Sequence, residues 1–351
     1  MTIYRRRPGI GPTGFAFAFS VFLSACGGGD GDTPSTAPVA TNAPQQTATP
    51  MTRKIARSYT RKGVTALSIT RDNSTLGAVT DSGEVRVLDA ASVQARVSFA
   101  EAHGGPATGV MFSADGRRVV SVGSDSAVHI WDAQSGQRLL TLRGHEHAIR
   151  SVALSADGSL VASAGEETRV MLWDATSGKL KRILSGHKDF VNALAFSPDG
   201  KYLATGSVDK QVLVWDLASG KVVRTLSGHS DEVDTLAFSP DGASLASGGE
   251  DAKVMLWDVA SGRKVQTLSG HEGAVRSVVF SADGAYLASA GADGRILVRD
   301  TATNQVTRIL SGPGGAINAI TFDGKSRNRL YSGGEDGHVV AWDVKNGTMR
   351  Q

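Results

Sequence analysis

Short apolar runs and polar turns alternate along the chain from about residue 53 onward. One representative stretch has apolar runs at 191–196, 202–206, 212–215 and 222–226, separated by turns such as Ser197–Gly200. Runs of strand length joined by turns rich in Gly, Asp, Ser and Pro predict an antiparallel meander of four strands. The runs are apolar almost throughout rather than alternating, which predicts sheets that are covered on both faces.

The meander repeats with a fixed period of 42 or 43 residues. All five tryptophans occupy one position of this period, and each precedes an aspartate: Trp131, Trp173, Trp215, Trp257 and Trp342. Two further copies carry Leu88 and Arg299 at the tryptophan position. The aspartate is present in all seven copies: Asp89, Asp132, Asp174, Asp216, Asp258, Asp300 and Asp343. A repeat of this length predicts a single domain built from seven similar units.

Gly-His pairs stand 28 residues before four of the tryptophan positions: Gly144-His145, Gly186-His187, Gly228-His229 and Gly270-His271. Ala102-His103 is an imperfect fifth copy. With this Gly-His to Trp-Asp signature, the sequence resembles the WD40 family of β-propellers over residues 53–351. The resemblance implies an all-β, seven-bladed propeller of four-stranded antiparallel blades.

Both ends of the repeat region bear on how the ring closes. Eight residues follow Asp343, which are too few for a turn and a full fourth strand. Residues 53–58 match the fourth-strand register of residues 180–185. We therefore expect the N-terminal strand to complete the last blade, so that the ring closes without a covalent link.

Five repeats place a histidine, a hydroxyl residue and an acid at constant spacing: His103, Ser121, Asp125; His145, Ser163, Glu167; His187, Thr205, Asp209; His229, Ser247, Asp251; His271, Ser289, Asp293. These sets resemble Ser-His-Asp triads, but an active site needs one copy, and no nucleophile-elbow sequence accompanies them. The WD40 resemblance instead implies structural tetrads that also include Trp131, Trp173, Trp215 and Trp257. In each, indole, hydroxyl, imidazole and carboxylate would form a buried hydrogen-bond chain.

Some repeats depart from this pattern. Arg299 replaces the tryptophan of repeat six, and Pro313 occupies the histidine position of repeat seven. Repeat one has Thr60, Ala78, Ser82 and Leu88 at the four positions. Blade one and the join beside it are therefore expected to be the least rigid part of the ring.

The repeats differ most at two registers on the face that usually binds partners in WD40 propellers. The candidate partner-binding residues are Arg150, Phe190, Asn192, Asp234, Arg276, Asn318, Glu166, Glu250 and Glu335. They predict a rim of mixed charge, with Phe190 as an aromatic anchor. The same pattern also fits an ordinary solvated surface.

Charge and possible metal ligands add little. The chain has 37 basic and 34 acidic residues, and it becomes neutral once Arg5–Arg7 are set aside, so there is no electrostatic case for nucleic acid. His145 and His147 lack further nearby ligands, so no metal and no cofactor are expected. The propeller is expected to be monomeric.

The N-terminal segment resembles a bacterial lipoprotein signal. Arg5–Arg7 precede the short apolar run Phe15–Leu23, and Leu23–Cys26 matches the lipobox. This implies cleavage after residue 25, lipid attachment at Cys26 and a flexible linker over 26–52. Gly27 after the cysteine favours the outer membrane, with the domain facing the periplasm or the cell surface. An ordinary signal peptide with a chance cysteine is the alternative.

Together these features predict a non-enzymatic protein-interaction scaffold that is exported and anchored in the bacterial cell envelope. Its partners would be envelope proteins that the sequence does not identify. The alternative is a propeller enzyme or small-ligand-binding protein that uses the central channel, and it would require polar groups converging from several blades. A third possibility is a propeller that makes only weak, generic contacts.

Overall fold

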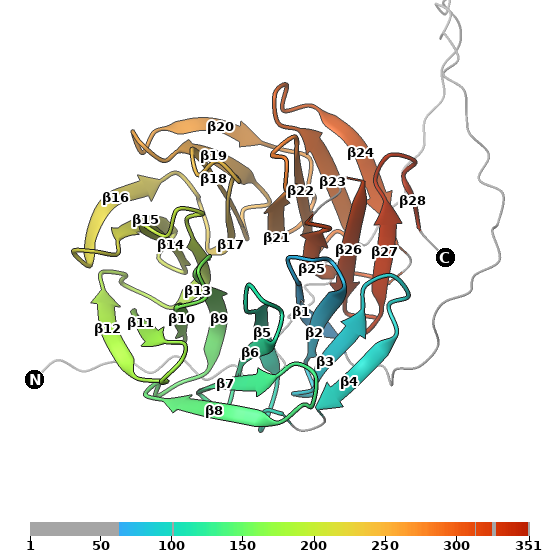
Figure 1. Ribbon diagram of the computed structural model, residues 1–351. Helices are drawn as coiled ribbons and strands as arrows, with labels where there is room; N and C mark the ends of the chain where they lie inside the picture. The colour runs from blue at the N-terminus through green and yellow to red at the C-terminus, as the bar shows by residue number, and fades with distance from the viewer. Residues whose placement is uncertain (1–62, 100–101, 313, 325–327, 350–351) are drawn as a thin grey trace, which may run out of the picture. The chain divides into compact units, whose positions relative to one another are not determined.

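The computed structural model describes residues 63–99, 102–312, 314–324 and 328–349. These residues belong to one compact unit, Thr52–Gln351. They form seven four-stranded antiparallel sheets around a common axis, with the first strand of each sheet innermost and the fourth outermost (Figure 1). The described ranges contain no helix long and apolar enough to cross a membrane. The predicted all-β, seven-bladed propeller is confirmed.

Each blade is a run of four consecutive strands. Blade one contains β1 (Val64–Ile69), β2 (Thr75–Thr80), β3 (Val85–Asp89) and β4 (Ala95–Phe99). Blade two contains β5 (Ala107–Phe112), β6 (Arg118–Gly123), β7 (Ala127–Asp132) and β8 (Arg138–Arg143). Blade three contains β9 (Ile149–Leu154), β10 (Leu160–Gly165), β11 (Arg169–Asp174) and β12 (Leu180–Ser185). Blade four contains β13 (Val191–Phe196), β14 (Tyr202–Ser207), β15 (Gln211–Asp216) and β16 (Lys221–Ser227).

The remaining three blades follow the same order. Blade five contains β17 (Val233–Phe238), β18 (Ser244–Gly249), β19 (Val254–Asp258) and β20 (Lys264–Leu268). Blade six contains β21 (Val275–Phe280), β22 (Tyr286–Gly291), β23 (Arg295–Asp300) and β24 (Val306–Ser311). Blade seven contains β25 (Ile317–Phe322), β26 (Arg329–Gly334), β27 (Val339–Asp343) and β28 (Thr348–Met349).

Local sequence explains the tight turns between these strands. In blade four, Gly200 ends the β13–β14 turn with φ +70°, and Gly220 ends the β15–β16 turn with φ +71°. Only glycine adopts this left-handed conformation without steric cost. The side chain of Asp216 also accepts the backbone N–H of Ser219 at 2.7 Å, which fixes the second turn. The aspartate that follows each tryptophan position therefore builds the hairpin that leads into the outer strand.

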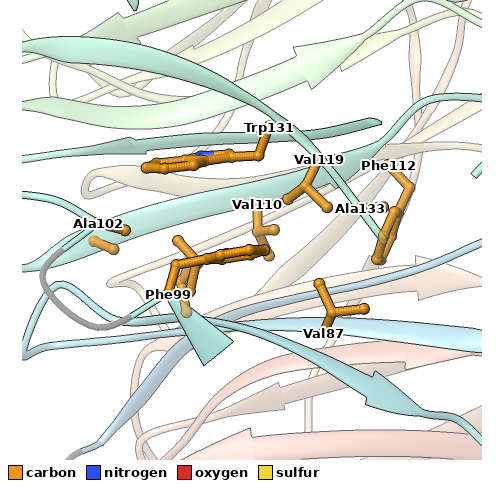
Figure 2. Packing of buried hydrophobic residues seen from close by; sticks show 11 residues of the cluster. Val87, Phe99, Ala102, Val110, Phe112, Val119, Trp131 and Ala133 are labelled. Atoms are coloured by element: carbon orange, nitrogen blue, oxygen red, sulfur yellow. The ribbon is translucent and has the colours of Figure 1, made fainter. Parts of the chain in front are cut away.

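The hydrophobic core lies between neighbouring blades. The second and third strands are buried on both faces, whereas the fourth strands are largely exposed. Figure 2 shows one such layer, where Phe99 of β4 lies against Trp131 of β7, with ring centroids 5.3 Å apart and planes 12° apart. Val87 from blade one and Val110 from blade two pack in the same cluster. Because each layer needs residues from two blades, a single blade cannot bury its own core.

Arginines on the fourth strands join neighbouring blades at their outer edge. Arg182 of β12 donates to the carbonyl of Leu217 in blade four at 3.0 Å. Arg308 of β24 donates to the carbonyl of Lys345 in blade seven at 2.9 Å. These charge-assisted bonds satisfy turn carbonyls and place a charged side chain on these two exposed edge strands, which discourages pairing with other chains.

The ring closes where blade seven meets blade one, with β25 packed beside β1. Asn318 Nδ2 donates to the carbonyl of Val64 at 2.8 Å, and the hydroxyl of Tyr331 donates to the carbonyl of Ala90 at 2.7 Å. Tyr331 is completely buried in this seam. Packing and hydrogen bonds therefore join the two end blades.

The C-terminus supplies blade seven with a fourth strand of only two residues, in keeping with the expectation that it is too short for a full one. Thr348 and Met349 form β28 and pair with Asp343 and Trp342. This is possible because the turn is tight: Gly347 has φ +69° and donates its N–H to the carbonyl of Asp343 at 2.8 Å. Residues 53–58, which were expected to fill this place, lie outside the described residues.

Candidate functional site

Side chains of the predicted tetrads lie in hydrogen-bond contact. In blade three, Trp173 Nε1 donates to Ser163 Oγ at 2.8 Å, and Ser163 Oγ lies 2.7 Å from His145 Nε2. His145 Nδ1 lies 3.2 Å from Glu167 Oε1. The same chain of contacts is formed in blades two, four and five by His103, Ser121, Asp125 and Trp131; His187, Thr205, Asp209 and Trp215; and His229, Ser247, Asp251 and Trp257.

Donor and acceptor chemistry assigns a structural role to each member. Indole is only a donor, so Ser163 accepts from Trp173 and donates its own proton to His145 Nε2. His145 Nδ1 then carries the proton that faces Glu167. Burial lowers the pKa of His145 in spite of the nearby Glu167 carboxylate, so the imidazole is neutral at neutral pH. Ser163 is fully buried and its proton is engaged, which leaves it no path to attack a substrate.

In blades three to five, the acid of the tetrad also binds the loop that precedes the first strand. Glu167 Oε1 accepts the backbone N–H of Glu146 at 2.7 Å, and Asp209 accepts that of Lys188 at 2.9 Å. Burial by itself would raise the pKa of Glu167, but the backbone N–H of Glu146 and the side chain of Arg169 bring it below its usual value. The tetrad thus fastens the loop before strand one to the turn after strand two.

Three blades depart from the tetrad, as their sequences suggested. In blade six, His271 contacts Ser289 at 2.8 Å, but Arg299 turns to the carbonyls of Asn304 and Ser269. In blade seven, Trp342 donates to Ser332 Oγ at 2.8 Å. Pro313 and Thr60 lie outside the described residues.

Blade one replaces the tetrad with a different buried pair. Arg86, which is 2% exposed, donates to Glu84 at 2.7 Å. Glu84 also accepts a hydrogen bond from Ser98 in β4. The Arg86–Glu84 ion pair and the Ser98 hydrogen bond thus link β3 to its outer strand, whereas the tryptophan position of this blade is filled by the buried Leu88.

Five of the candidate rim residues belong to a set of hydrogen-bonded side chains around the inner strands, which we call the strand-one belt. Its members are the second residues of the seven first strands: Thr65, Thr108, Arg150, Asn192, Asp234, Arg276 and Asn318. All of them except Asp234 donate to the next blade, and Asp234 accepts from Asn192 of the preceding blade. Arg150 donates to Asn192 at 2.9 Å, Asn192 to Asp234 at 2.9 Å, and Arg276 to Asn318 at 2.6 Å.

The remaining members of the strand-one belt bind backbone carbonyls of the neighbouring blade. Thr65 donates to Ala107 O and Thr108 to Ile149 O, each at 2.5 Å. Asn318 donates to Val64 O across the seam at 2.8 Å. The side chains at the belt positions, which differ most between repeats, are therefore hydrogen-bonded between neighbouring blades.

The predicted glutamates lie beside the belt but differ in environment. Glu166 accepts from Arg150 and Glu335 from Arg276, both at 3.2 Å. Glu250 lies instead near Glu232 and Asp231, and burial together with the charge of Glu232 raises its pKa.

Asp234 is the electrostatically strained member of the strand-one belt. Its Oδ2 atom is buried and has no hydrogen-bond partner among the described residues. Burial raises the pKa of Asp234 to about 7, aided by the charges of Glu250 and Glu232 and opposed by Asn192 and Arg150. The group therefore carries only a partial charge at neutral pH.

Phe190 is the largest exposed aromatic contact on this face. Its side chain is 38% exposed, and the guanidinium of Arg150 lies over the ring at 5.4 Å from the centroid. Arg150 is held at the same time by Asn192 and Glu166. The aromatic and cationic groups are therefore presented in a fixed arrangement.

Sequence reasoning missed His129 in β7, which joins the tetrad of blade two. Its Nε2 lies 3.2 Å from Asp125 Oδ2. The signal was available, because the equivalent positions in blades three to six hold Met171, Leu213, Met255 and Leu297. Cys26, the predicted lipid-attachment residue, lies outside the described residues.

Comparison with known families agrees with this geometry. Residues 178–216, 220–258, 262–300 and 304–343 match the WD domain, G-beta repeat. Residues 23–175 match the Nucleolar protein 10-like, N-terminal domain, which is a β-propeller family. No curated protein matches the chain. The chain is thus a seven-bladed β-propeller that carries WD40 repeats.

Proposed function

We propose that this propeller is a protein-interaction scaffold held at the bacterial cell envelope. WD40 propellers typically serve as scaffolds that bind protein partners. The proposed binding face is the one that carries the strand-one belt, the loops before the first strands and the turns after the second strands. The partners we expect are envelope proteins.

The observation that carries this proposal is the Arg150–Phe190 pair. Aromatic and arginine side chains are the groups in which protein–protein binding energy concentrates. Phe190 is exposed, and Arg150 is fixed over it by Asn192 and Glu166. Because the side chains of Arg150 and Phe190 are already ordered, docking of a partner would cost less of their conformational entropy.

We infer that the protein is not an enzyme. The repeated hydroxyls Ser121, Ser163, Thr205 and Ser247 are fully buried, and each is hydrogen-bonded to an indole and an imidazole. Five near-identical histidine–hydroxyl–acid sets also fit a repeated structural role better than a single catalytic one. An enzyme or ligand-binding site in the central channel has less support, since the polar side chains of the belt bind one another or backbone carbonyls of the neighbouring blade.

The envelope anchor is proposed from the sequence of the N-terminal segment, in which Cys26 follows a short apolar run. Fractionation of cells expressing the wild type and Cys26→Ser tests it. We expect the wild type in the membrane fraction and incorporating labelled fatty acid, and the variant to do neither. Equal membrane association of both proteins would contradict the lipid anchor at Cys26 but would leave the proposed protein-interaction role unaffected.

Quantitative co-purification after crosslinking tests the binding face. Phe190→Ala and Arg150→Ala should each remove the partners recovered with the wild type by severalfold or more, because a truncated anchor typically costs about 2 kcal/mol or more. Lys201→Ala is the matched control, since Lys201 is exposed in the same blade at the other end of β13. Recovery that is unchanged in both anchor variants would overturn the assignment of this face.

A further inference from the structure

Blade two carries a histidine, His129, at a position that is apolar in blades three to six. His129 lies on β7, two residues before Trp131, so both side chains project from the same face of the strand. His129 is 2% exposed. Its ring is 4.7 Å from that of His103 and 5.4 Å from that of Trp131. The exchange therefore places a second imidazole directly against a tetrad.

The two imidazoles share one carboxylate. His103 Nδ1 lies 2.9 Å from Asp125 Oδ1, and His129 Nε2 lies 3.2 Å from Asp125 Oδ2. In blades three to six, the acid in this position accepts a backbone N–H from the residue after the tetrad histidine, such as Glu146 or Lys188. In blade two the second carboxylate oxygen faces His129 instead.

We propose that His103, Asp125 and His129 form a binding site for one divalent transition-metal ion of the Zn²⁺ type. Two neutral imidazoles and a carboxylate are a ligand set that Zn²⁺ and its first-row neighbours favour. The three potential ligand atoms all lie within 4.8 Å of one another. A water molecule would complete a four-coordinate ion.

The outer nitrogen of each imidazole already has an oxygen partner, as metal-binding histidines require. His103 Nε2 lies 2.8 Å from Ser121 Oγ, and His129 Nδ1 lies 3.1 Å from Thr141 Oγ1. With the ion bound, both outer nitrogens carry the proton and donate it to these hydroxyl oxygens, which fixes the ring orientations. The nitrogens that face Asp125 are then free of protons and available to the metal.

Asp125 determines how a metal ion reaches the site and how it fits between the ligand atoms. The side chains of His103 and His129 are 0% and 3% exposed, whereas that of Asp125 is 21% exposed. Ligand atoms around a tetrahedral zinc ion lie about 3.3 Å apart, so three ligand atoms within 4.8 Å of one another need only small shifts as the ion enters. The carboxylate can turn toward solvent to make that room, and the water ligand would lie on the same open side.

Metal titration of the purified full chain tests this site. Isothermal titration with Zn²⁺ should show one ion per chain with proton release, and Co²⁺ should give the visible absorption of a tetrahedral complex. His129→Leu copies the residue of blades four and six and leaves the four tetrad residues in place. It should weaken Zn²⁺ binding by about 100-fold or more, since even loss of an outer-shell partner costs about 10- to 100-fold.

Two further variants keep the outcome unambiguous. His129→Gln retains a polar contact to Asp125 and should also lose Zn²⁺, which separates ligation from folding. His147→Ala removes an exposed histidine near the tetrad of blade three and should bind as the wild type does. Absence of Zn²⁺ and Co²⁺ binding to the wild type, wild-type Zn²⁺ affinity in both His129 variants, or loss of binding in His147→Ala would each overturn the proposal.

Discussion

Single residues decide where this repetitive ring is strained. Asp234 belongs to the strand-one belt, yet one of its carboxylate oxygens is buried without a partner and two glutamates lie close by. Arg299 is 7% exposed at a position where five other blades bury an indole, and its Nε atom has no partner among the described residues. Each departure gives a prediction that concerns one side chain.

Asp234 should make stability depend on pH in the direction opposite to an ordinary salt-bridged acid. Its folded pKa of about 7 lies above the usual value of 3.8, so the folded state holds the proton longer than the unfolded state. Its contribution to the free energy of unfolding is therefore present below about pH 4 and is lost as pH rises toward about 7, at about 1.4 kcal/mol per pH unit.

Asp234→Asn should remove this loss. Urea denaturation of variant and wild type between about pH 4 and pH 7 should show a stability advantage of the variant that grows with pH and levels off above about 7. Asp231→Asn is the control, because Asp231 is an acid of the same blade with a side chain 54% exposed. A difference between Asp234→Asn and the wild type that stays constant with pH would contradict the assignment.

Arg299→Trp should stabilise the protein by about 1–2 kcal/mol. The substitution removes a buried cation whose pKa is lowered by burial, and it supplies an N–H donor to Ser289 Oγ as in the other blades. Arg299→Phe is the matched control, because it fills the site without the donor. In urea denaturation, the unfolding midpoint should be higher for Arg299→Trp than for the wild type and Arg299→Phe, with the slope of the transition unchanged. If Arg299→Trp were no more stable than Arg299→Phe, Ser289 Oγ would not be accepting a hydrogen bond from the indole.

At the scale of the element, the tetrad explains why the same four strands recur with so little variation. Ser163 bridges an indole and an imidazole, whereas Ser289 of blade six contacts only the imidazole of His271 among the tetrad groups. Removing the hydroxyl therefore leaves two buried groups unsatisfied in blade three and one in blade six.

Ser163→Ala should accordingly destabilise the protein more than Ser289→Ala. We expect the difference to be about 1–3 kcal/mol, which is the cost of one additional unsatisfied buried donor. Thermal and urea unfolding of both variants measure it. Equal losses would mean that the indole–hydroxyl bond contributes little to holding the blade together.

Strand positions followed from the sequence, but contacts between blades did not. The apolar runs at 191–196 and 202–206 correspond closely to β13 and β14, because strand length and turn residues are local properties. The strand-one belt depends on side chains 42 residues apart that meet only once neighbouring blades pack, as Arg150 and Asn192 do. The contacts of His129 with Thr141 and of Glu84 with Ser98 depend likewise on cross-strand geometry that periodicity does not express.

At the scale of the whole molecule, the contact between blades seven and one is the least stable part of the ring. Blade one lacks the tetrad, and β28 covers only Trp342 and Asp343 of β27. Val339, Val340 and Ala341 remain half-buried, whereas the matching residues of β23 are buried. Blade one and this join should therefore open before the rest of the ring.

Hydrogen exchange tests the order of opening. Backbone amides of β1–β3 and β27 should exchange faster than those of blades three to five. Tyr331→Phe removes the buried bond to Ala90 and should lower the unfolding free energy by about 1–2 kcal/mol, with the added exchange concentrated in blades one and seven. Uniform protection around the ring, or a variant effect spread equally over all blades, would count against a weak seam.

Site-specific photo-crosslinking in intact cells tests the central claim most directly, namely that the face around the strand-one belt is where partners bind. A photoreactive residue is placed at position 190 on that face or at position 201 at the other end of β13. The account predicts discrete protein adducts from position 190 and few from position 201. Equal adducts from both positions, or adducts from position 201 alone, would contradict it.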